Sequence, residues 1–123
     1  MEIAVDFDGT CVNHEYPHIG KDNPYCIEVL KALNKKGHKL ILFTMRGGNE
    51  LEEAVDWFRK NEVDLYGINT NPTQSFWTLS PKAYAQVYID DAALGCPLDY
   101  KGHYRPRVDW YNVETLLRSQ GIL

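Results

Sequence analysis

The sequence predicts a three-layer α/β fold of the Rossmann-like type, with a mostly parallel sheet, in a single domain over residues 1–123. Apolar runs within 2–6, 39–44 and 86–89 are typical of strands that are buried on both faces. These runs alternate with segments of helical periodicity, which favours parallel strands joined by crossover helices. A chain of 123 residues is long enough for one hydrophobic core but not for a second domain.

The boundaries of the elements follow from capping and turn residues. Asn23 followed by Pro24 is typical of a helix start, and Asn49 with Glu52 three residues later resembles a capping box. Glycine closes helices because it adopts the left-handed conformation readily. The expected elements are strand 2–6, loop 11–22, a helix from Asn23 to Gly37, strand 39–44, a helix capped by Asn49, strand 65–68, an irregular segment 69–81, strand 86–89, and a last helix from the cap Asp109 through Gln120.

Polar side chains follow four of the expected strands, at the point where each strand ends. Parallel sheets bind ligands at the carboxyl ends of their strands, so we expect these side chains to converge on one edge. Asp6 and Asp8 stand two residues apart, and alternation along a strand sends both to the same side. The complete set is Asp6, Asp8, Thr44, Asn69, Asp90 and Asp91.

The pattern Asp6-Phe7-Asp8-Gly9-Thr10 after an apolar strand resembles motif I of the haloacid dehalogenase (HAD) superfamily. Thr44 matches its motif II, a Ser or Thr that ends an apolar strand, and Asp90-Asp91 matches the acidic pair of motif IV. Lys82 is the candidate for the intervening lysine of motif III. The resemblance spans residues 2 to about 91. It implies a HAD fold and a Mg²⁺-dependent phosphatase that works through an aspartyl-phosphate.

The resemblance assigns a role to each of these residues. Asp6 is the expected nucleophile, because a nearby Mg²⁺ screens its repulsion from the phosphoryl oxygens, and Asp8 is the expected general acid and base. Superfamily members that are dehalogenases lack a carboxylate at the position of Asp8, so its presence indicates phosphoryl transfer. The implied metal ligands are Asp6, the backbone carbonyl of Asp8 and Asp90, with Asp91 behind them. Thr44 is expected to hydrogen-bond the phosphoryl group, and Lys82 to neutralise it and hold Asp6.

Two of the candidate residues have an alternative interpretation. Only seven residues separate Lys82 from Asp90, so Lys82 reaches the site only from a turn that folds back, and is otherwise a surface lysine. Arg46 follows the second expected strand. It either binds a substrate anion through two parallel hydrogen bonds or pairs with an acidic neighbour.

Several other residues have a weaker signal. The basic and aromatic stretch 100–107 either lines the substrate entrance, stacks on a nucleic-acid end or is a solvated loop. His14 and His18 follow motif I and are read mainly as surface residues, and Asn69 and Asn71 as turn residues. The tryptophans Trp57, Trp77 and Trp110 are expected in the core or at an interface.

Composition limits the location and the partners of the protein. Three cysteines without a close pair and the lack of a leader-like start favour the cytoplasm, and no apolar run reaches the roughly 20 residues of a membrane span. The net charge of −4 offers no general attraction for nucleic acid. Sugar phosphates, nucleotides and polynucleotide ends remain open as phosphorylated substrates.

The spacing of the motifs leaves no room for the cap domain that often covers HAD sites. A macromolecular substrate or a neighbouring subunit of a homo-oligomer then serves as the lid. The alternative function is a phospho-accepting or phosphoryl-binding module with a receiver-like α/β fold. Receiver domains place the phosphorylated Asp after the third strand, however, where this chain has Asn69.

Overall fold

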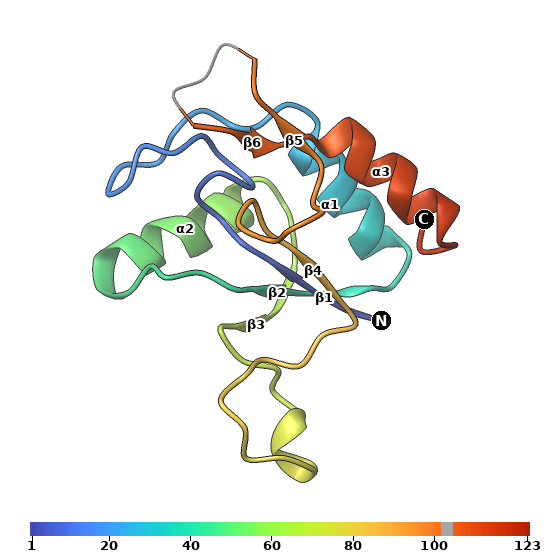
Figure 1. The fold of residues 1–123 in the computed structure, drawn as a ribbon. Coiled ribbons are helices and arrows are strands. Elements are labelled where there is room, and N and C mark those ends of the chain that lie inside the picture. Colours follow the sequence, from blue (N-terminus) through green and yellow to red (C-terminus); the bar gives the residue numbers. More distant parts are fainter. Residues whose placement is uncertain (102–104) are drawn as a thin grey trace.

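A computed structural model describes residues 1–101 and 105–123, and its centre is a four-stranded parallel sheet (Figure 1). The strands are β1 (Glu2–Val5), β2 (Lys39–Leu42), β3 (Leu65–Ile68) and β4 (Val87–Ile89), in the order β3-β2-β1-β4. Val5 of the central strand pairs with Leu42 and with Ile89. Because β1, β2 and β4 therefore end level with one another, the residues that follow them lie at one edge.

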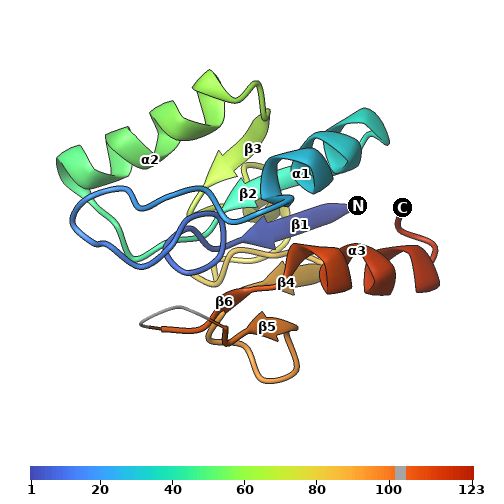
Figure 2. The ribbon, with the colours of Figure 1, turned by 90° about the horizontal axis from the view of Figure 1, so that it is seen from above.

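Three helices cover one face of this sheet, as Figures 1 and 2 show. They are α1 (Cys26–Lys35), α2 (Gly48–Lys60) and α3 (Trp110–Ser119). Alternate strand residues such as Ile3, Val5 and Leu42 are buried against their apolar stripes. Burial of this apolar surface is the main driving force for the fold. The predicted Rossmann-like α/β architecture is confirmed.

The opposite face is covered by the segment between β3 and β4 (Figure 1). This third layer contains one short 3-10 helix, η1 (Gln74–Phe76), within the stretch expected to be irregular. Two buried amides hold it together. Asn71 donates to the carbonyl of Tyr84, and the Gln74 amide donates to the carbonyls of Ser80 and Lys82 while accepting from Tyr84 N. Asn71 therefore does more than the turn formation expected of it.

Two of the three expected helix caps are wrong. Helix α1 begins only at Cys26, after Tyr25 at φ 71°, and has no capping side chain, while Nδ2 of Asn23 donates to the Thr10 carbonyl. Helix α2 begins at Gly48 and takes Gly47 as its N-cap, without a capping side chain. The third cap is confirmed, because Asp109 accepts from Asn112 N at the start of α3.

A small antiparallel pair, β5 (Leu98–Asp99) and β6 (Arg107–Val108), was not expected from the sequence. Two-residue strands are too short to show an alternating pattern. The pair is joined to the loop after β1, because Val108 N donates to the carbonyl of Gly9 at 2.9 Å. Residues 102–104 of the basic and aromatic stretch lie outside the described residues. None of the described helices combines the length and apolar character that a membrane span requires.

The buried amide of Gln74 provides a test of the third layer. We expect Gln74→Ala to lower the free energy of unfolding by about 1–3 kcal/mol, because it leaves buried backbone groups without partners. Gln120→Ala, at an exposed glutamine that follows α3, is the matched control and should change stability by less than about 0.5 kcal/mol. Equal effects in denaturant titrations of the two variants would contradict this role of Gln74.

Candidate functional site

The chain turns sharply directly after Asp8, and Gly9 makes this turn possible. Its φ is +83°, a conformation that side chains disfavour. A Cβ at Gly9 would also lie 2.0 Å from Nε2 of His14 and 2.5 Å from Oδ2 of Asp91. Glycine is therefore required at position 9 for two reasons: the backbone has a positive φ there, and two polar side chains approach too closely to leave room for a Cβ.

Distant parts of the chain hold this turn in place. The Thr10 carbonyl accepts from Asn23 Nδ2 and from Trp110 Nε1, each at 2.7 Å. The Gly9 carbonyl accepts from Val108 N. Trp110 is fully buried, so its predicted place in the core is confirmed, and its indole nitrogen also orients the site. The start of α1 and the C-terminal segment thus fix the position of motif I.

Three carboxylates converge at the edge where β1 and β4 end. Asp6, Asp90 and Asp91 each offer an oxygen, and these oxygens all lie within 4.8 Å of one another. Burial, with the Asp91 hydrogen bond and the negative charge of Asp90, raises the pKa of Asp6 to about 8, although a hydrogen bond from Thr10 opposes the shift. Burial also raises the pKa of Asp90. The cluster therefore resists carrying its full negative charge without a cation.

The donor set fits a hard divalent cation such as Mg²⁺, which prefers carboxylate and carbonyl oxygens. Among the described residues, nothing donates to the backbone carbonyl of Asp8, so it is free to act as the ligand that the resemblance implies. Oδ2 of Asp91 lies 2.7 Å from Nε2 of His14, and Thr10 lies against its Oδ1 at 3.4 Å. These partners suit Asp91 to support the ligands from behind.

The carboxylate of Asp8 is turned away from this cluster and pairs with Arg46. Nε of Arg46 donates to Oδ2 at 2.7 Å, and Nη2 donates to Oδ1 at 2.8 Å. The remaining donors bond the carbonyls of Pro17, His18 and Glu50. All five donors of the guanidinium are used, and its side chain is 1% exposed. Of the two roles open to Arg46, the structure shows the pairing with an acidic neighbour.

Thr44 lies at the end of β2, as expected, and its hydroxyl remains available. Its backbone N–H donates to Oδ1 of Asn69 at 2.8 Å, and its Oγ1 accepts from Arg46 N. Asn69 adopts φ 56°, and its own N–H donates to the Leu42 carbonyl. The hydroxyl proton of Thr44 has no acceptor among the described residues and is free to donate to a ligand.

Lys82 lies in the segment between η1 and β4, which covers the second face of the sheet. Its ammonium nitrogen is 5.4 Å from the ring centroid of Tyr88, and the side chain is exposed. No carboxylate among residues 1–101 and 105–123 lies within ion-pair distance of it. The structure therefore does not bring Lys82 into contact with Asp6, and its role at the site remains a prediction.

The sequence assigned no site role to three residues that the structure places at the site. His14 contacts Asp91, Asn23 holds the motif I turn, and Asn69, which was expected at this edge but read as a turn residue, orients Thr44. Each is a polar residue in a turn-rich segment, where the pattern indicates only a loop. Their partners are distant along the chain or depend on an unusual backbone conformation, so spacing alone could not identify them.

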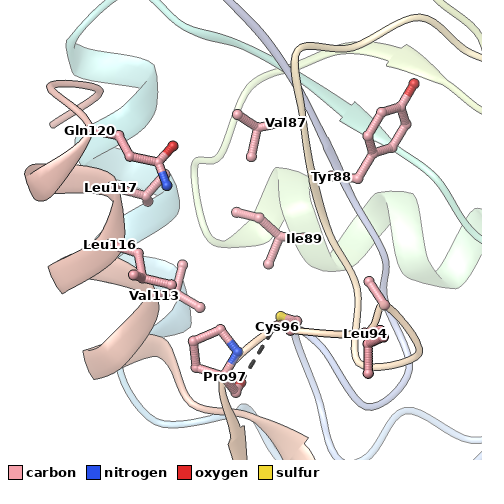
Figure 3. Close-up of a pocket in the computed structure, with 12 residues that line it drawn as sticks. Val87, Tyr88, Ile89, Leu94, Cys96, Pro97, Val113, Leu116, Leu117 and Gln120 are labelled. Atoms are coloured by element: carbon pink, nitrogen blue, oxygen red, sulfur yellow. Dashed lines mark hydrogen bonds between the residues drawn. The ribbon is translucent and has the colours of Figure 1, made fainter.

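A separate apolar cavity of about 280 Å³ lies between β4 and α3 (Figure 3). Val87 and Ile89 point towards α3, while Tyr88 points the other way. The lining includes Cys96 and Gln120 but no charged side chain. This cavity is unsuited to a phosphoryl group, which supports the acidic edge as the candidate site.

Comparison with known structures identifies a similar chain. A structure described as that of a conserved protein coded by a locus from Bacteroides thetaiotaomicron matches with a TM-score of 0.80 and 35% sequence identity. The match covers 98% of this chain and 91% of that chain. The chain matches no protein-family model and no curated protein.

The raised pKa of Asp6 predicts a pH dependence of stability without metal. The folded state keeps a proton that the unfolded state, with the ordinary pKa of 3.8, releases, so the free energy of unfolding falls as pH rises from about 4 to about 8. Asp6→Asn should remove this part of the fall and stabilise the metal-free protein at pH 8 by about 1–2 kcal/mol. Thermal unfolding of the wild type and of Asp6→Asn at pH 5 and pH 8, with chelator or with Mg²⁺, measures this pH dependence of stability. If the wild-type protein in chelator became more stable as pH rose from 5 to 8, that result would contradict the raised pKa of Asp6.

The Arg46 pair predicts that lysine cannot replace this arginine. Lysine keeps the charge but not the planar fork, so we expect Arg46→Lys to cost about 1–3 kcal/mol of unfolding free energy. Arg59, which is 72% exposed, is the control, and Arg59→Lys should cost less than about 0.5 kcal/mol. Denaturant titrations that rank the two variants equally would argue against a structural role for the fork.

Proposed function

We propose that this chain, which belongs to the same family as the conserved Bacteroides thetaiotaomicron protein, is a Mg²⁺-dependent phosphomonoester hydrolase of the capless HAD type. The observation that carries the proposal is the convergence of Asp6, Asp90 and Asp91 within 4.8 Å, beside Asp8 and Thr44 at the carboxyl edge of a parallel sheet. The motif order and the donor chemistry of this edge support the same reaction class.

Asp6 is the proposed nucleophile. An oxygen of its carboxylate attacks phosphorus, the bond from phosphorus to the leaving oxygen breaks, and an aspartyl-phosphate forms on Asp6. A bound Mg²⁺, held by Asp6, the Asp8 carbonyl and Asp90, would supply positive charge that favours the ionised form of Asp6. The free hydroxyl of Thr44 donates to a phosphoryl oxygen, and Lys82 supplies further positive charge once it approaches the site.

Asp8 is the proposed proton carrier. It gives a proton to the leaving oxygen, and its carboxylate then takes a proton from the water that attacks phosphorus and releases phosphate from Asp6. In the structure both Asp8 oxygens accept charge-assisted hydrogen bonds from Arg46. Proton transfer therefore requires that this pair loosen when substrate is bound, so we assign Arg46 to positioning Asp8 rather than to binding substrate.

The surroundings of the site agree with the rest of the proposal. The described chain between Thr44 and Lys82 contains α2, β3 and η1 but no cap domain, so a second subunit or the substrate itself has to cover the site. Three free cysteines, two of them buried, suit a cytoplasmic protein. The receiver-like alternative is less well supported, because Asn69 rather than an aspartate follows β3.

Phosphate release from a panel of phosphomonoesters tests the proposal. We expect Mg²⁺-dependent turnover that chelation abolishes and that Asp6→Asn lowers by at least about 10³-fold, because the variant lacks the nucleophile. Asp64→Asn, at an exposed aspartate before β3, should retain full activity. Stable phosphorylation of Asp6 without phosphate release would instead establish the phospho-accepting alternative.

A further inference from the structure

A cavity of about 650 Å³ lies beside the acidic cluster, on the loop that follows motif I. His14 joins the two, because it lines the cavity while its Nε2 lies 2.7 Å from Asp91. The volume is within the range of about 300–1,000 Å³ that small-molecule sites occupy. His14 and Asp91 thus connect the cavity to the cluster that contains Asp6. The lining consists of His14, Glu15, Tyr16, His18 and Arg105.

Most of these side chains have no partner within the part of the chain that the structure describes. Glu15, His18 and Arg105 make no side-chain hydrogen bond or ion pair there. Tyr16 is 60% exposed, and its contact is with Arg46, whose guanidinium carbon lies 5.2 Å from the ring centroid. Polar and aromatic groups that the protein does not use itself are available to a ligand.

The loop that presents these groups is anchored. Arg46 bonds the carbonyls of Pro17 and His18 while it pairs with Asp8. Asn13, at the start of the loop, accepts from Nη1 of Arg107 at 3.1 Å. Such anchoring reduces the ordering cost that a ligand otherwise meets on binding.

The chemistry of the lining favours a planar, uncharged group over a second anion. Four of the five side chains present a planar π system, which is suited to stacking. The fifth, Glu15, is a carboxylate that accepts hydrogen bonds from ring or amino N–H groups and repels anions. The formal charges of Glu15 and Arg105 are equal and opposite, so these two residues give the cavity no net attraction for a second phosphate.

We propose, on the basis of the phosphatase function proposed above, that the substrate is a nucleoside monophosphate. Its heterocyclic base stacks in the cavity against Tyr16, and its phosphate lies at Asp6. The substrate class then follows from the groups around the leaving group rather than from motifs of the HAD superfamily.

The test compares adenosine 5′-monophosphate with ribose 5-phosphate, which has no base. We expect kcat/KM to be about 5- to 150-fold higher for the nucleotide, the range that base stacking provides. Tyr16→Ala should reduce this ratio towards one, whereas Tyr16→Phe, which keeps the ring, should preserve it. Tyr111→Ala is the matched control, because Tyr111 is also 60% exposed but lies on α3. Binding of adenosine, followed by NMR titration, tests the cavity independently of hydrolysis.

The outcomes separate the two proposals. Equal turnover of both phosphates without adenosine binding would overturn the base site and leave the phosphatase in place. Adenosine binding that Tyr16→Ala abolishes, without turnover of any phosphomonoester, would support the base site and overturn the phosphatase. Preference for a sugar bisphosphate over the nucleotide would show that the cavity binds a second anion, and would overturn the inference. Absence of both turnover and adenosine binding would overturn both proposals.

Discussion

Electrostatic repulsion among the carboxylates at the carboxyl edge of the sheet is the constraint around which this site is built. Two of the four have a cationic or imidazole partner, since Asp8 pairs with Arg46 and Asp91 contacts His14. Asp6 and Asp90 have no such partner among the described residues, and burial raises the pKa of both. The protein thus supplies a cationic or imidazole partner to two of these carboxylates and none to the other two. The ligation of metal by Asp6 and Asp90, with Asp91 behind them, remains a prediction.

The fold supplies the geometry through contacts that are distant in the sequence. Level strand ends bring Asp6 and Asp90 to one edge, and the Gly9 turn lets His14 and Asp91 approach the backbone closely. Asn23 and Trp110, which are distant in the sequence, both donate to the Thr10 carbonyl. Much of the C-terminal segment therefore supports motif I, although it contains no recognisable motif itself. A change in the packing of α3 would reach the proposed nucleophile, Asp6, through the Trp110 hydrogen bond to the Thr10 carbonyl.

The sequence was informative where one physical rule dominates. Parallel strands with buried faces are continuous apolar runs, so the strands and the convergence of their polar ends were predictable, and β3 has the predicted bounds. Prediction failed where several partners compete for one group. Asn23 and Asn49 have good capping side chains, but Asn23 bonds the motif I turn and α2 begins one residue before Asn49. Arg46 had two candidate partners, and only the tertiary structure shows that Asp8 accepts its fork.

The Arg46 fork also links the cavity beside the site to Asp8, the proposed proton carrier. One guanidinium bonds the Asp8 carboxylate and the carbonyls of Pro17 and His18, on the loop that carries Tyr16. A ligand that shifts this loop therefore alters the hydrogen bonds that hold Asp8. In the mechanism proposed above, this coupling makes proton transfer by Asp8 depend on an occupied site. Recognition of the leaving group and its protonation would then both depend on the buried guanidinium of Arg46.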